Sequence, residues 1–152
     1  MTFDEGLREE LKSIVNLNKR VYPIVAPEGI KPPFVVYRKS RSKYSKDLAG
    51  IITDVEGTYE IIVICDDYKT LDILIEEIKK KLIKVLFRRI GETGPIINNL
   101  ELEDLGNEYI YQPNAYKNSL LLNISYKLET AFSKVFKETV GLTPKEYRDS
   151  LV

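Results

Sequence analysis

The stretch GTYEIIVICDDYKTLDILIEEIKKKLIKVLFRR, residues 57–89, predicts a strand that leads directly into a long helix. Within residues 57–65 both alternating sets of side chains become apolar toward the end, which is typical of a central strand covered there on both faces. Residues 66–89 carry one apolar stripe at helical spacing, formed by Leu71, Leu74, Ile75, Ile78, Leu82, Val85 and Leu86. This pair of elements predicts a sheet with a helix packed on it.

Three large apolar side chains of the predicted helix do not belong to this stripe. At about 100° per residue, Ile73, Ile83 and Phe87 project to the side away from it, among Glu76 and Lys80. Scattered apolar residues are common on protein surfaces. Three along one line also fit a surface that a partner covers. Both interpretations stay open, and these three residues are the candidate subunit interface.

The first 37 residues predict another helix and a short strand. Thr2 and Glu5 have the spacing of a capping box, and an apolar stripe then runs to about Leu17. Residues 21–33 contain four prolines, which exclude a regular helix or an interior strand. They predict an extended connection into a short strand at residues 34–37.

Residues 38–46, RKSRSKYSK, contain five basic residues and no acidic one. Serines and a tyrosine separate the basic side chains, a composition that predicts a solvated, mobile loop. Such a loop could instead contact a partner or nucleic acid through its positive charge. The candidate contact residues are Arg38, Lys39, Arg41, Lys43, Tyr44 and Lys46.

Three extended segments are predicted after the GETGP break, at residues 96–105, 107–113 and 118–128. Gly106-Asn107 predicts a hairpin turn between the first two. The third segment alternates apolar with polar residues, so one of its faces packs and the other is wet. The whole layout predicts an α+β fold, with a small antiparallel or mixed sheet of four to five strands and two helices on one face.

The composition excludes several classes of function. Lys plus Arg number 23 and Asp plus Glu 23, whereas a dedicated nucleic-acid binder usually carries a large basic excess. There is no His and a single Cys, which excludes imidazole metal sites, Ser-His triads and paired-cysteine zinc sites. Cys65 ends an apolar run and is expected to be a small buried hydrophobic residue. Neither catalysis nor a cofactor is expected.

Acidic residues are the remaining candidates for metal chemistry. Asp66 and Asp67 follow the predicted strand, and Asp47, Asp54 and Glu56 lie near it in sequence. Carboxylates of this kind could bind a divalent metal. Adjacent acids between a strand and a helix are more often helix caps, and no nucleophile, base and oxyanion donor come together. No metal site is therefore expected.

The sequence contains no pattern that directs it to a membrane. Its acidic start lacks the basic and apolar regions of a signal peptide. No apolar run approaches the ~20 residues that span a bilayer. A lone thiol also fits a reducing compartment, so a soluble protein made in a cytoplasm is expected.

Three phrases carry a resemblance to a known family: RVYPIVAPEGIKPPFVVY, GTYEIIVICDDYKTLDILIEEIKKKL and EYIYQPNAYKNSLLLNISYKL. They and their order, over about residues 7–128, resemble the tail terminator, or tail completion, proteins of long-tailed bacteriophages. The resemblance implies a small α/β subunit that forms a homohexameric ring on the last ring of the tail tube. Such a ring stops tube polymerisation and presents a surface to the neck.

The resemblance also implies partners and a location. The chain would be a structural virion protein at the junction of tail and neck, assembled in the host bacterial cytoplasm. Its partners would be copies of itself, the tail tube protein, neck or connector proteins and, transiently, DNA that passes through the lumen. A head-to-tail connector subunit is the nearest alternative, and a DNA-binding regulator is the alternative from another class.

The regulator rests on a second, local resemblance. FSKVFKETVGLTPKEYR, residues 132–148, resembles the end of the DNA-reading region of AraC-type regulators. DNA reading needs a supporting helix before the recognition helix, but LLLNISYKLET has the alternation of a strand. Residues 129–152 are therefore predicted to be a helical hairpin that extends the 1–128 domain. Its candidate docking residues are Phe132, Val135, Phe136, Leu142 and Tyr147.

Overall fold

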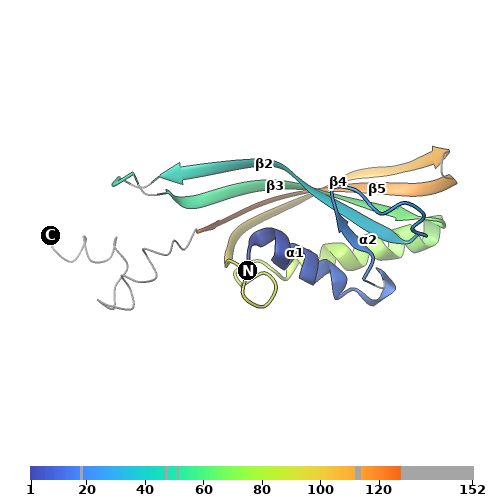
Figure 1. The fold of residues 1–152 in the computed structure, drawn as a ribbon, viewed down its shortest axis with the longest axis horizontal. Coiled ribbons are helices and arrows are strands. Elements are labelled where there is room, and N and C mark those ends of the chain that lie inside the picture. The colour runs from blue at the N-terminus through green and yellow to red at the C-terminus, as the bar shows by residue number, and fades with distance from the viewer. Residues whose placement is uncertain (18, 47, 51, 112–113, 128–152) are drawn as a thin grey trace.

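A five-stranded mixed sheet with two helices on one face forms the part of the chain that the structure describes (Figure 1). This computed structural model describes residues 1–17, 19–46, 48–50, 52–111 and 114–127. The elements are α1 (Phe3–Lys12), the short 3-10 helix η1 (Val15–Leu17), β1 (Val21–Pro23), β2 (Phe34–Lys46), β3 (Ile52–Cys65), α2 (Tyr68–Ile83), β4 (Ile97–Tyr111) and β5 (Asn114–Lys127). The predicted α+β class, with a mixed sheet and two helices, is confirmed. The predicted C-terminal helical hairpin and its five docking residues lie outside the described residues.

The strands follow the order β1-β2-β3-β5-β4 across the sheet. β1 lies parallel to β2, and every other neighbouring pair is antiparallel. β2 and β3 continue together past the helices at one end of the molecule, and β4 and β5 end together at the other (Figure 1). The sheet therefore has a part that the helices cover and a part that they do not. The uncovered part is formed by the end of β2 and the start of β3 and is here called the hairpin extension.

The core lies between the sheet and the two helices. The predicted stripe of α2 is buried there from Leu71 to Leu82, and Val85 is buried just beyond the helix end. Facing it from the sheet are Ile61 on β3 and Leu120 on β5, both fully buried. Burying one such side chain contributes roughly 1.5–3 kcal/mol, so this layer stabilises the fold.

Both helices begin at caps that the sequence already indicates. The Glu5 N–H donates to the Thr2 hydroxyl at 3.2 Å, as the capping-box spacing predicts. The Thr70 N–H donates to the Asp67 carboxylate at 3.1 Å. Of the two acids between strand and helix, Asp67 is thus explained by capping.

The helix predicted to run to residue 89 ends at Ile83. Beyond it the backbone pairs with the start of β4: the Phe87 N–H donates to the Ile97 carbonyl at 2.7 Å, and the Ile97 N–H donates to the Arg88 carbonyl at 3.1 Å. Phe87 adopts a left-handed φ of 65°. Hydrogen bonds to β4 thus replace the last turns that periodicity predicted.

Residues 38–46 form the second half of β2, so the prediction of a loop is wrong. The register places Arg38 beside Glu60 and Lys43 beside Glu56 on β3. Most of this segment is exposed on both faces, and no apolar alternation marks it as a strand. Pairing with β3, including the ion pair between Arg38 and Glu60, determines its conformation.

The predicted hairpin turn at Gly106-Asn107 is also wrong, because β4 runs through it without a break. The pairing register shifts between Asp104 and Asn107, as in a β-bulge. Gly106 has a φ of 92°, and its N–H donates to the Asp104 carboxylate at 2.8 Å. The glycine serves the bulge, and the pairing of Tyr111 with Asn114 closes the β4–β5 hairpin.

Candidate assembly site

Two strand segments carry opposite charge: the part of β2 beyond its pairing with β1, and β4 at the opposite edge of the sheet. Residues 38–46 of β2, here called the basic edge, contain five basic residues and no acidic one. Residues 97–111 of β4, here called the acidic edge, contain four acidic residues and no basic one: Glu101, Glu103, Asp104 and Glu108. Sequence reasoning missed the acidic edge because it divided β4 into two strands. A charge count over the undivided stretch would have found it.

Few charges of the basic edge are neutralised by ion pairs within the described residues. Arg38 forms an ion pair with Glu60 at 2.6 Å, and its side chain is about half exposed. A pair of this kind contributes at most about 1 kcal/mol. Among the described residues, neither Arg41 nor Lys43 has a charged partner within ion-pair distance. Their charge is therefore available to another molecule.

The acidic edge is partly neutralised at its bulge. The Lys79 ammonium of α2 lies 2.9 Å from the Asp104 carboxylate, to which the Asn118 amide also donates at 3.0 Å. Burial alone would raise the pKa of Asp104, but hydrogen bonds from Lys79, Gly106 and Asn118 lower the pKa on balance. Asp104 is therefore a structural carboxylate that ties β4 to α2.

A shallow polar hollow on the face away from the helices joins the two edges. Arg41 and Lys43 from the basic edge line it together with Asn99 and Glu101 from β4. Its floor is the polar face of β3 and β5, where the Thr58 hydroxyl donates to the side-chain amide oxygen of Asn123 at 2.7 Å. Charges of both signs thus share one open face, without the enclosure that a small-molecule site needs.

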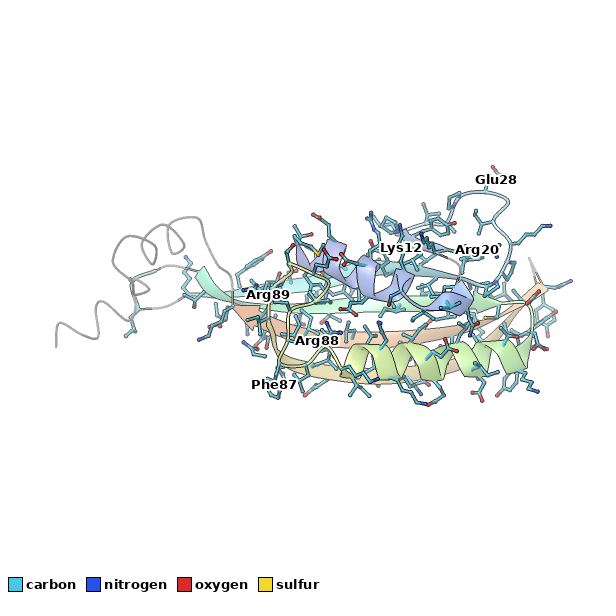
Figure 2. All side chains as sticks on the ribbon, turned by 90° about the horizontal axis from the view of Figure 1, so that it is seen from below. Lys12, Arg20, Glu28, Phe87, Arg88 and Arg89 are labelled. Carbon is cyan, nitrogen blue, oxygen red and sulfur yellow. The ribbon has the colours of Figure 1, made fainter. Side chains whose placement is uncertain are left out.

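The three candidate interface residues are exposed: Ile73 is 48%, Ile83 59% and Phe87 75% exposed. Only Ile73 and Ile83 lie on α2. Phe87 follows the helix end and projects outward on the β4 side (Figure 2). The single helical line that sequence predicts is therefore broken, although all three side chains reach solvent. Their role in a subunit contact stays a prediction.

The strand at residues 57–65 is covered by helices on one face only within the described chain (Figure 1). On the other face, Ile62 and Ile64 lie beside Val36 and Phe34 in the register, and all four side chains remain partly exposed. The second covering layer that the sequence predicts is thus not part of the described residues. The apolar strip formed by these four side chains lies on the same face of the sheet as the polar hollow.

The chemistry of the remaining candidates is structural. Burial raises the pKa of the Cys65 thiol to about 12, with help from Asp66 and Asp67, so the thiol is protonated and unreactive at neutral pH. No group of three or more Cys, Asp and Glu side chains that could hold a metal ion occurs among the described residues. None of the helices in the described part has the length and apolar character needed to cross a membrane.

Comparison with known proteins gives a likeness in fold, but none in sequence family. No protein-family model matches the chain, and no curated protein matches it. A chain in the solved structure described as the virion of a native gene transfer agent particle has the same fold, with a TM-score of 0.62 and 12% sequence identity. The match covers 83% of this chain and 95% of that chain. The two chains therefore share a fold over nearly the whole length of the virion chain.

Proposed function

We propose that the protein is a structural virion protein that acts as a tail terminator. It forms a homohexameric ring at the head-proximal end of the tail tube, stops tube polymerisation and joins tail to neck. The observation that supports this most is the fold shared with a chain of the gene transfer agent virion. The phrases within residues 7–128 that resemble tail terminator proteins lead independently to the same class.

The proposed mechanism is steric and involves no catalysis or cofactor. A bound ring covers the strand edges and loops of the final tube layer, so that no further layer can add. This mechanism needs only contact surfaces, and the edge of β2 beyond Tyr37 and the edge of β4 offer them. Assembly would take place in the host bacterial cytoplasm, and the mature location would be the tail/neck junction of the virion.

Each candidate surface has a place in this proposal. Ile73, Ile83 and Phe87 contribute to contacts between subunits. The hairpin extension reaches beyond the helix layer (Figure 1), and Tyr44 and Lys46 belong to the last residues of β2. In this proposal they contact the adjoining ring or DNA in the lumen. Positive charge there suits both an acidic protein surface and phosphate.

A head-to-tail connector subunit is the second candidate. The gene transfer agent chain is described only as part of a virion, so its likeness supports a connector equally. Binding to tail tubes separates the two functions, because a connector has no need to limit tube length.

The test is mass measurement and negative-stain microscopy of the purified protein, alone and mixed with growing tail tubes. The expected result is rings of six subunits and tubes that stop growing with a ring on one end. A protein that stays monomeric beside tube ends, with tubes that continue to grow, would contradict the proposal.

A further inference from the structure

The basic and acidic edges are both free of strand partners over most of their length in the described chain. β1 pairs with β2 only as far as Tyr37, so within the described residues β2 has no neighbour on that side from Arg38 onward. At the start of β4, the segment after α2 pairs with Ile96 and Ile97, and no other described strand pairs with that side of β4 beyond Asn98. Each open edge presents unpaired backbone groups, and a sheet edge of this kind is a template for another strand.

The charges make like edges repel and unlike edges attract. Two basic edges would place lysines and arginines opposite each other, and two acidic edges would do the same with glutamates. A basic edge beside an acidic edge instead forms pairs of opposite charge. This arrangement favours contact between two different patches of identical chains, which is the contact that closes a ring.

The pairing register also aligns the charges. Arg41 lies in the same row across the sheet as Glu101, and Arg38 lies in the same row as Glu103. All four face away from the helices, because their rows contain Thr58 and Glu60, which alternate along β3 with the buried Tyr59 and Ile61. β4 runs antiparallel to β2 within one sheet. A neighbour rotated about an axis along the strands would therefore bring its β4 antiparallel to β2, with the rows matched.

Apolar residues extend this alignment by one further row. The Ile24 N–H donates to the Tyr37 carbonyl at 2.8 Å, and Ile24 and Val25 are exposed at that end of the basic edge. The row of Tyr37 ends across the sheet at Asp104, next to the exposed Leu105 in the bulge. The same rotation would bring Leu105 of one copy toward Ile24 and Val25 of the next.

We infer that the basic edge of each copy pairs with the acidic edge of the next copy, so that a continuous antiparallel sheet runs around the assembly. Arg41 then lies opposite Glu101, and Arg38 opposite Glu103, of the neighbouring copy. This inference rests on the proposed ring. It assigns the residues from Arg38 to Lys43 to the lateral contact and leaves Lys46 for axial partners.

Two charge-reversal variants test the inference. R41E/K43E places two glutamates on the basic edge, and E101K/E103K places two lysines on the acidic edge, so that in either variant residues 41 and 101 of neighbouring copies carry like charges. Each variant alone should need at least about a tenfold higher concentration to assemble, and the difference should shrink as salt screens the charges. An equimolar mixture should assemble again, because the two variants can alternate around a ring with an even number of subunits. Native mass spectrometry reads both the mass and the composition of the rings.

The control is K12E/K69E, which changes the net charge by the same amount as R41E/K43E but at exposed residues of α1 and α2. It should assemble like the wild type. A thermal unfolding transition and the circular dichroism spectrum show that each variant is folded. The chain R41E/K43E/E101K/E103K, in which residues 41 and 101 again carry opposite charges, should also assemble.

The outcomes separate this inference from the proposed function. If folded R41E/K43E and E101K/E103K each form rings as readily as the wild type, or if their mixture forms none, edge pairing is wrong. The wild type would still be a terminator if it caps tail tubes. If the wild type itself stays monomeric beside tube ends, the ring fails and the edge inference fails with it.

Discussion

The helix-covered part of the sheet and its two charged edges obey different physical rules. Under the helices, alternate residues of β3 and β5 are buried, and packing determines which face turns inward. Along residues 38–46, both faces are mostly exposed, and pairing with β3 and the ion pair between Arg38 and Glu60 hold the strand. The helix-covered part therefore provides the stability of the subunit, whereas residues 38–46 offer surface for contacts and contribute little to that stability.

The largest test of this comparison is removal of core volume on α2. Ile78→Ala deletes a fully buried side chain and should lower the free energy of unfolding by about 2–5 kcal/mol, because a cavity remains. Ile73→Ala removes the same atoms from the exposed side of the same helix and should change it by less than about 0.5 kcal/mol. Urea unfolding measures both. Equal losses would show that Ile73 is buried in the subunit itself.

A smaller effect is expected at the ion pair that ties α1 to the segment after α2. The Arg88 guanidinium donates to both Glu10 carboxylate oxygens, at 2.7 and 3.1 Å, and the Gly91 N–H donates at 3.0 Å. Burial alone would raise the pKa of Glu10, but these hydrogen bonds lower the pKa on balance. Glu10→Gln should cost about 1–2 kcal/mol, less than for a fully buried pair because Arg88 is partly exposed.

The same ion pair predicts a pH dependence. A carboxyl whose pKa is lower in the folded state stabilises the fold above its ordinary value of 4.5, and this stabilisation is lost as the pH falls through the folded pKa. Urea unfolding between pH 7 and pH 3 should therefore show a shallower decline in Glu10→Gln than in the wild type. Parallel curves would contradict the assigned role of Glu10.

The smallest effect on folding is expected from the exposed apolar residues. The variant I73S/I83S/F87S should leave the free energy of unfolding of the monomer within about 1.5 kcal/mol of the wild type, because all three side chains are already in solvent. It should weaken self-assembly if these residues lie between subunits. Analytical ultracentrifugation at several concentrations measures this. Assembly like that of the wild type would remove them from the interface and leave the strand edges as the contact.

Sequence reasoning succeeded where local chemistry and burial agree. The capping-box spacing of Thr2 and Glu5 predicted the start of α1, and the apolar stripe predicted the buried face of α2. It failed where pairing with another strand decides the conformation. Arg38 to Lys46 form a strand only because β3 pairs with them, and α2 stops at Ile83 because the following backbone pairs with β4.

The sequence alone predicts the α+β class and the two helices on one face, and it excludes imidazole and paired-cysteine chemistry. Periodicity and composition can be read from the chain without knowledge of its distant contacts. Only the tertiary structure decides that β4 lies at the edge opposite β2, with Glu101 in the row of Arg41. Strand order and register depend on contacts between residues far apart in sequence, and no local pattern encodes them. The opposite charges of the two segments form a candidate contact only because the strand order places them at the two margins of the sheet.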